Sequence, residues 1–236
     1  MLTLQEYITN DLLDFSTGEV ILVDKPLTWT SFNVVSKIKH SIKHHTSFQK
    51  DGIKLKPKVG HAGTLDPLAT GLLIICTGKK TKEIESFQQQ KKTYTGTFFI
   101  GATTPCYDLE KEIDFTFPTE HITSDLILTT AHTFLGKQEQ VPPVFSAIWV
   151  NGKRSYELAR EGVVAELKSR TIEIEAFEIS KIEFPYVSFK IVCSKGTYIR
   201  SIARDFGLAL NSGAHLTSLR REAIGSFNVK DAITIV

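Results

Sequence analysis

Asp66 is the single carboxylate in the stretch GHAGTLDPLATGLLIICTG, residues 60 to 78, where glycines and small residues surround it. Because a residue that precedes proline is kept out of the helical region, Pro67 holds Asp66 in an extended or turn conformation. A carboxylate with a fixed direction suits a nucleophile or a charged stabiliser. Taken alone, the segment favours a turn aspartate bonded to its own backbone. A phosphate loop fits less well, since no Lys-Ser or Lys-Thr pair follows at the required spacing.

The stretch CSKGTYIRSIARD, residues 193 to 205, predicts a strand, a glycine turn and a helix that begins near Thr197. Tyr198 and Arg200 then fall in the first helical turn. An arginine there opposes the helix dipole and therefore calls for a negative partner. A carboxylate beside it would stay ionised in a buried site. A surface arginine is the alternative.

The stretch KKTYTGTF places Tyr94 on an expected strand directly after two lysines. A tyrosine in such a strand commonly just packs in the core. An aromatic ring beside basic residues can instead stack on an unpaired base of an RNA.

The pattern of helices and strands expected around these residues predicts an α+β fold. Strands outnumber helices and do not alternate with them regularly, which indicates a mixed or largely antiparallel sheet. Helices are expected at 30–45, 81–90 (capped by Thr81), 123–135, 154–162 and 196–210. Strands are expected at 19–26, 72–76, 93–102, within 140–153, and at 171–179, 186–194 and 216–227.

Composition excludes several classes of protein. A chain of 236 residues that is 42% hydrophobic can bury a sizeable core, and no apolar run approaches the 18 residues of a membrane helix. The first fifteen residues contain acids but no lysine or arginine, which argues against a signal peptide. The three cysteines are scattered and form neither a disulfide framework nor a zinc cluster. We therefore expect a protein of the cytoplasm.

Charge is unevenly distributed although the net charge is only +2. Residues 37–58 hold seven lysines and one acid, a local charge of +6, whereas residues 107–125 hold six acids and one lysine, a local charge of −5. The basic block suggests a phosphate-bearing partner, and a solvated loop is the alternative. The histidines at 40, 44 and 45 lack a cysteine or carboxylate at ligand spacing, so we assign them to the basic face and expect no metal.

With these segments in view, the chain resembles the TruB family of tRNA pseudouridine synthases from about residue 18 to about residue 228. GEVILVDKPLTWTSFNVV is similar to the family's opening strand and Lys-Pro segment, and VGHAGTLDPLATGLL to its long Gly-His-x-Gly-x-Leu-Asp-Pro signature. KTYTGTFFIGATT, CSKGTYIRSIARDFG and AHLTSLRREAIGSF match further family segments. The resemblance implies the pseudouridine-synthase fold, a mixed and mostly antiparallel sheet with flanking helices and a central cleft.

The resemblance also implies the reaction, which converts the uridine at position 55 in the T loop of tRNA to pseudouridine. The C–N glycosidic bond breaks, the freed uracil turns, and C5 joins the same sugar. Because nothing is oxidised and no group leaves the RNA, we expect no metal and no cofactor. The expected partner is the T stem-loop, and the expected state is a monomer.

Site residues carry over one by one from the resemblance. Asp66 matches the catalytic aspartate, and Arg200 an arginine that pairs with it; which atom Asp66 attacks is left open. Tyr94 matches the ring that stacks on the target base. Supporting matches are His61, Tyr198, Leu219, Lys25 and Pro26.

The resemblance also suggests a domain plan. Residues 1–228 form the catalytic domain with an RNA-contacting insertion at about 137–155, and residues 229–236 form a stub in place of a C-terminal PUA-type domain. The wording GATTPCYDLEKE departs from the family pattern, so Asp108 has no assigned role. Contacts to the RNA backbone are expected from Lys54, Lys56, Lys58, Lys153 and Arg154.

Two rival functions fit parts of this pattern. A non-catalytic RNA-binding or tRNA-folding protein would need the basic face and Tyr94 but not Asp66. A synthase of the same fold could act on another RNA.

Overall fold

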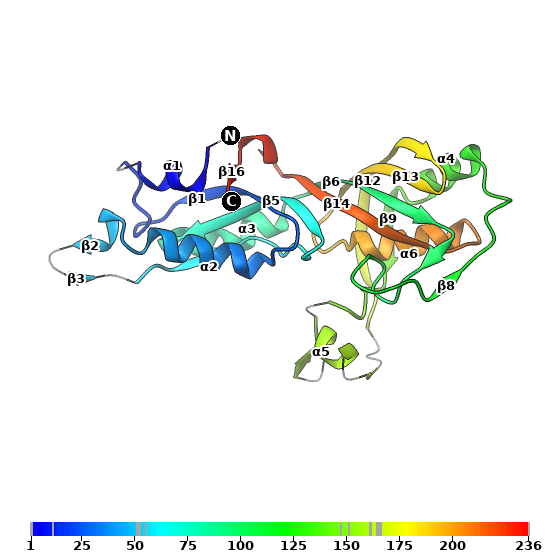
Figure 1. Ribbon diagram of the computed structural model, residues 1–236, viewed down its shortest axis with the longest axis horizontal. Helices are drawn as coiled ribbons and strands as arrows, with labels where there is room; N and C mark the ends of the chain where they lie inside the picture. Colours follow the sequence, from blue (N-terminus) through cyan, green and yellow to red (C-terminus); the bar gives the residue numbers. More distant parts are fainter. Residues whose placement is uncertain are drawn as a thin grey trace. The chain divides into compact units, whose positions relative to one another are not determined.

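The computed structural model describes residues 2–10, 12–50, 53–54, 56–146, 148–150, 152–160, 162–163 and 167–235. The chain forms two compact units (Figure 1): Met1–Tyr94 with Arg220–Val236, and Thr95–Leu219. It passes into the second unit along β6 (Lys92–Ile100) and returns along β14 (Ala214–Ile224). None of the helices in the described ranges is long and apolar enough to cross a membrane.

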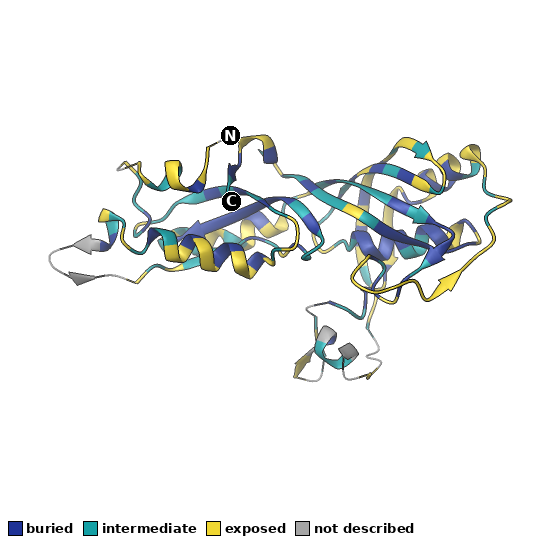
Figure 2. Cartoon of the chain, in the orientation of Figure 1, coloured by how far each residue is buried: buried dark blue, intermediate teal, exposed yellow. Residues whose placement is uncertain are grey.

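The first unit is built around β5 (Ala69–Thr77), which lies between β1 (Val20–Lys25) and β14. β1 and β5 are antiparallel, β4 (Val59–His61) folds back on β5, and β16 (Ile233–Thr234) adds a parallel edge to β1. Figure 2 shows β5 buried along nearly its whole length. This agrees with the apolar run that follows Asp66 in the sequence, since a strand covered on both faces is apolar at successive positions.

Helices cover both faces of β5. Leu73 and Ile75 pack in one apolar cluster with the buried face of α2 (Ser31–Ile42). Leu72 and Ile74 point to the other side, in a cluster that contains Phe87 of α3 (Ile84–Gln89). The alternation follows from the period of two in a strand. Thr30 is the N-cap residue of α2, and its hydroxyl accepts a hydrogen bond from the Asn33 amide, so the expected start of the helix near residue 30 is confirmed.

The helix expected at 81–90 begins differently. Residues Gly78–Glu83 form the 3-10 helix η2, and α3 starts only at Ile84, with Glu83 at its cap. Thr81 donates a hydrogen bond to the Gly78 carbonyl at 2.8 Å. The prediction that Thr81 caps this helix is therefore wrong, because its hydroxyl serves the turn before the helix. The first unit also contains α1 (Leu4–Ile8), η1 (Thr46–Phe48), β2 (Gln49–Lys50), β3 (Ile53–Lys54), β15 (Phe227–Asn228) and η3 (Val229–Asp231).

The second unit is an antiparallel sheet with an aromatic core. Its strand order is β6, β13 (Tyr186–Cys193), β12 (Arg170–Glu183) and β9 (Gly136–Gln140). The rings of Phe98 and Phe189 stack with centroids 4.2 Å apart, and Phe177 and Phe206 pack against them. Phe206 belongs to α6 (Ile199–Ala209), whose apolar face is buried throughout. The remaining elements are α4 (Ser124–Thr133), β7 (Ala102–Thr103), β8 (Phe115–Thr116), β10 (Trp149–Val150), β11 (Lys153–Arg154) and α5 (Ser155–Arg160).

The predicted class, α+β with a mostly antiparallel sheet, is confirmed. β9 was not anticipated, because its sequence GKQEQ lacks apolar alternation. It becomes a strand by pairing with β12, in a register that places Gln140 opposite Arg170.

Candidate active site

The main chain on both sides of Asp66 is held by the segment that leads into α2. The Ser31 hydroxyl accepts a hydrogen bond from the Leu65 amide at 2.9 Å and donates one to the Leu65 carbonyl at 3.3 Å. The Thr28 amide donates to the Pro67 carbonyl at 2.9 Å. Leu65 is buried and Asp66 half-buried. The loop thus points one partly exposed carboxylate in a direction that its neighbours determine.

Lys25 supports this loop from within the core. It ends β1, is fully buried, and its Nζ donates to the carbonyls of Trp29 at 2.6 Å and Pro26 at 3.0 Å. A longer contact of 3.5 Å reaches the Pro67 carbonyl. Burial lowers the pKa of Lys25 to about 8, while the negative charge of Asp66 opposes this shift. Lys25 therefore ties the Lys-Pro segment to the loop and acts electrostatically on Asp66.

Arg221 is a supporting residue that sequence reasoning missed. It lies on β14 with 1% of its surface exposed, and Nε donates to the Leu72 carbonyl at 2.7 Å. Its Nη2 and Nη1 donate to the carbonyls of Gly63 at 3.1 Å and Thr64 at 3.4 Å. The pair Arg220-Arg221 was a possible signal, since neighbours on a strand face opposite sides and one arginine had to point inward.

Gly71, on β5 just after the Asp66 loop, occupies a position that only glycine fits. Its φ is +101°, and a Cβ there would collide with the backbone of Arg221. A larger residue would push β14 away from β5 and with it the guanidinium that holds the loop.

His61, which ends β4, is half-buried near the same cation. Burial lowers its pKa, the positive charge of Arg221 lowers it further, and the Gly63 backbone offsets part of the shift. Its Nδ1 is buried, and within the described ranges no well-aligned hydrogen bond reaches it. The ring is therefore neutral at pH 7 and suited to packing and hydrogen bonding.

Arg200, in the second unit, is buried, so the alternative of a surface arginine is wrong. Its Nε lies 3.6 Å from Oδ2 of Asp108, which is also buried. Nη1 and Nη2 donate to the carbonyls of Cys106 at 3.3 Å and Phe145 at 3.0 Å. Asp108, which had no assigned role, is thus a charge partner of Arg200. The predicted pairing of Arg200 with Asp66 joins the two units and stays a prediction.

The predicted base-contacting residues are distributed over both units. Tyr198 is the N-cap residue of α6 and is half-buried. Tyr94 is buried on β6 and Leu219 half-buried on β14, at the two positions where the chain passes between the units. The structure therefore places Asp66, Lys25 and His61 in the first unit, and Tyr198 and Arg200 in the second.

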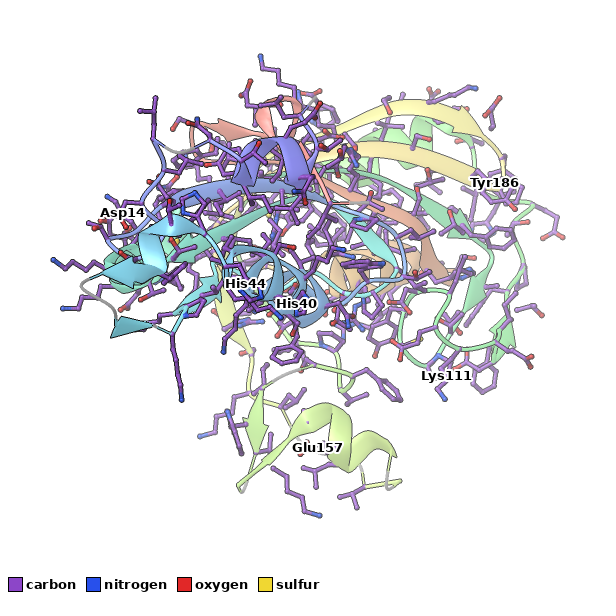
Figure 3. The ribbon with its side chains drawn as sticks, turned by 60° about the vertical axis from the view of Figure 1, so that its left-hand side comes forward. Asp14, His40, His44, Lys111, Glu157 and Tyr186 are labelled. Atoms are coloured by element: carbon purple, nitrogen blue, oxygen red, sulfur yellow. The ribbon has the colours of Figure 1, made fainter. Side chains whose placement is uncertain are left out.

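The predicted RNA-contacting lysines are at least partly exposed wherever their side chains are described. This holds for Lys56, Lys58 and Lys153. The side chains of Lys54 and Arg154 lie outside the described part. His40 and His44 are exposed at the C-terminal end of α2 and just beyond it (Figure 3).

His45 does not belong to that basic face. Its ring packs edge-on against Phe15 with centroids 4.8 Å apart, and its Nδ1 lies 2.9 Å from the Ser47 hydroxyl. Among the described residues, no group of three or more His, Cys, Asp or Glu could hold a metal ion.

Solved structures define the class of this fold. The chain aligns with a chain from the crystal structure of a Cbf5-Nop10-Gar1 complex with a TM-score of 0.69, at 26% identity. The alignment covers 99% of this chain and 56% of that one. A second match, to the archaeal box H/ACA sRNP Nop10-Cbf5 complex, has a TM-score of 0.64 at 25% identity, covering 94% and 53%. The fold is that of the pseudouridine synthases.

Sequence comparison gives the family. The model of the TruB family pseudouridylate synthase N-terminal domain matches residues 50–199. A tRNA pseudouridine synthase B from Flavobacterium johnsoniae is 58% identical over 94% of this chain and 95% of its own. One from Phocaeicola vulgatus is 55% identical over 94% and 92%. The chain belongs to the TruB family, and the resemblance noted in the sequence is confirmed.

Proposed function

We propose that this protein isomerises a uridine of tRNA to pseudouridine, at position 55 in the T loop. Relatives named for tRNA pseudouridine synthesis match almost the whole chain. The observation that carries the proposal is the Asp66 loop, where hydrogen bonds from Ser31, Thr28 and Arg221 hold the main chain around a single carboxylate. Preorganisation of this kind lowers the free-energy cost of reorganisation during a reaction.

The reaction rearranges atoms within one nucleotide. The bond from the sugar carbon to N1 of uracil breaks, the ring turns, and C5 forms a new bond to the same carbon. A proton leaves C5 and N1 gains one, so substrate and product contain the same atoms. We assign Asp66 as the ionised carboxylate that acts on the sugar or the ring.

The other site residues have supporting roles in this proposal. Tyr94 and Tyr198 would contact the flipped ring, Leu219 would form an apolar wall, and Arg200 would hold Asp66 charged. Extracting the base costs a few kcal/mol. Lysines such as Lys56, Lys58 and Lys153 would offset that cost through phosphate contacts.

We further propose a monomer of the cytoplasm that binds the T stem-loop through a catalytic domain of residues 1–228, with residues 137–155 touching the RNA. The three cysteines are buried and are not joined in disulfides, as is usual for proteins of reducing compartments. Light scattering with and without tRNA measures the molecular mass of the protein in solution and thus its oligomeric state. A stable dimer in both conditions would contradict the monomer.

The test of the function uses Asp66→Asn, which keeps the side-chain volume and removes the charge. Purified wild type and variant are incubated with unmodified tRNA transcript, and pseudouridine is mapped by position. We expect one modified T-loop uridine with the wild type, and a rate at least about 10³-fold lower with the variant at unchanged tRNA affinity. Near-normal product from Asp66→Asn would refute the assignment of Asp66. Product at another position would refute the substrate site.

A further inference from the structure

The buried side-chain amide of Gln140 forms hydrogen bonds with both the backbone N–H and the backbone carbonyl of Tyr198. Gln140, the last residue of β9, has 2% of its surface exposed. Its Oε1 accepts from the Tyr198 amide at 2.8 Å, and its Nε2 donates to the Tyr198 carbonyl at 3.1 Å. The N-cap position of a helix has no intrahelical partner for its own amide, and the Tyr198 side chain makes no capping hydrogen bond among the described residues. Gln140 therefore fixes the backbone from which the Tyr198 ring projects.

The ring of Tyr198 is held from another direction by Arg170. Arg170 begins β12 and stands opposite Gln140 in the register of β9 and β12. Its Cζ lies 4.4 Å from the centroid of the Tyr198 ring. A guanidinium at this distance is attracted to the ring face and restricts the ring plane.

Among the described residues, no partner other than the Tyr198 ring accounts for the Arg170 guanidinium. Its Nε and Nη2 are buried and have no hydrogen-bond partner in the described part of the chain. Burial lowers the pKa of Arg170. Burying donors without partners costs free energy, which a leucine or methionine at this place would avoid. A cation retained at such a cost points to a requirement at the ring.

The turn before Tyr198 and the helix after it are fixed to the same two strands. The Ser194 amide donates to the Glu173 carbonyl on β12 at 2.9 Å, and the Ser194 hydroxyl accepts from the Glu173 amide at 2.9 Å. After the turn, the Ser201 hydroxyl donates to the carbonyl of Val141, the residue after β9, at 2.9 Å. The support of Tyr198 is therefore rigid on both sides.

We propose that Gln140 and Arg170 are positioning residues for Tyr198: Gln140 sets its backbone and Arg170 sets its ring plane. The inference rests on the proposed function, in which Tyr198 contacts the flipped uridine. A ring covered on one face by a guanidinium can present its other face or its hydroxyl to a base. Neither residue touches the RNA in this proposal.

The test is a double-mutant cycle of Arg170→Met and Tyr198→Leu, with Arg170→Lys as the conservative variant. The single-turnover rate of pseudouridine formation and the Kd for the same tRNA transcript are measured in parallel. We expect Arg170→Met to lower the rate roughly tenfold, with the Kd changed less than about twofold, and Arg170→Lys to recover part of the rate. In the Tyr198→Leu background, Arg170→Met should not lower the rate further, because Arg170 acts on the rate only through the Tyr198 ring.

Gln140→Ala tests the backbone contact and should lower the rate by a similar factor at unchanged Kd; should this variant not fold, the Arg170 cycle decides. Lys190→Met is the matched control, since Lys190 is an exposed cation of the same unit that pairs with Glu178. It should leave rate and Kd unchanged.

Two results would overturn the inference. Multiplicative losses in the cycle would mean that Arg170 acts independently of Tyr198. A weakened Kd with a shallower salt dependence for Arg170→Met would mean that Arg170 binds phosphate. Failure of the proposed function is distinguishable, because the wild type itself would then form no pseudouridine in tRNA.

Discussion

The Asp66 loop and the Tyr198 turn present a side chain in two different ways. Around Asp66 the contacts reach the main chain of its neighbours, from Ser31 to Leu65 and from Arg221 to Gly63 and Thr64. At Tyr198 the contacts reach the residue itself, its backbone through Gln140 and its ring through Arg170. The first arrangement determines where a charge is placed. The second determines the plane of a ring, which matters for stacking.

Arg221→Met should produce the largest effect and break the first arrangement alone. Three carbonyls lose their donor, that of Leu72 in a buried place and those of Gly63 and Thr64 in partly buried ones. The free energy of unfolding of the first unit should therefore fall by about 3 kcal/mol. Hydrogen exchange should accelerate at residues 63–72 and stay unchanged at 196–201. Equal acceleration in both segments would show that the two arrangements are not independent.

Arg220→Met is the matched control for that experiment. Arg220 is the adjacent residue on β14, and it pairs with Asp24 at 2.6 Å while partly exposed. Loss of this partly exposed ion pair should lower the free energy of unfolding by only up to about 1 kcal/mol.

A comparison of Arg200→Met with Asp108→Asn tests whether Arg200 acts on Asp66 or on Asp108. If Arg200 holds Asp66 charged, Arg200→Met should lower the rate of pseudouridine formation by about two orders of magnitude. Asp108→Asn should keep most of the activity, because it removes only the partner seen within the second unit. The single-turnover rates decide. Equal losses in both variants would assign Arg200 to the packing of its own unit.

Lys25 gives the first arrangement a pH dependence. The folded state holds Lys25 at a pKa of about 8, against about 10.4 for an unfolded lysine. Between these values the unfolded state binds more protons, so this group makes stability rise with pH from about 8 to about 10.5. The free energy of unfolding of the wild type minus that of Lys25→Met should increase over this window. A constant difference would mean that Lys25 titrates normally.

Neutralising lysines of the basic block should have the smallest effect and leave both arrangements intact. Replacing Lys54, Lys56 and Lys58 by glutamine should weaken tRNA binding and make its salt dependence shallower. The slope of log K against log salt concentration should fall in magnitude by up to about 0.7 to 0.9 for each phosphate that the protein no longer neutralises. The rate at saturating tRNA should not change. Binding measured from low to moderate salt checks this, and an unaltered slope would remove these lysines from the interface.

Much of the framework was predictable because it depends on local rules. Pro67 restricts Asp66, Thr30 caps α2, and the apolar spacing after Tyr198 marks the buried face of α6. The partners were not predictable in this way. Gln140 and Tyr198 are 58 residues apart, and Arg221 and Gly63 are 158 apart. No periodic pattern connects such positions.

By itself, the sequence determined the α+β class and the family, and it supplied the residues that we assign to the chemistry. Each of these depends on a short segment with its own backbone restrictions. Only the tertiary structure decided which buried cations hold the Asp66 loop, that Asp108 pairs with Arg200, and that Gln140 and Arg170 meet at Tyr198. The physical reason is strand pairing. The register of β9 with β12, and the place of β14 beside β5, bring polar side chains to turns far away in the sequence.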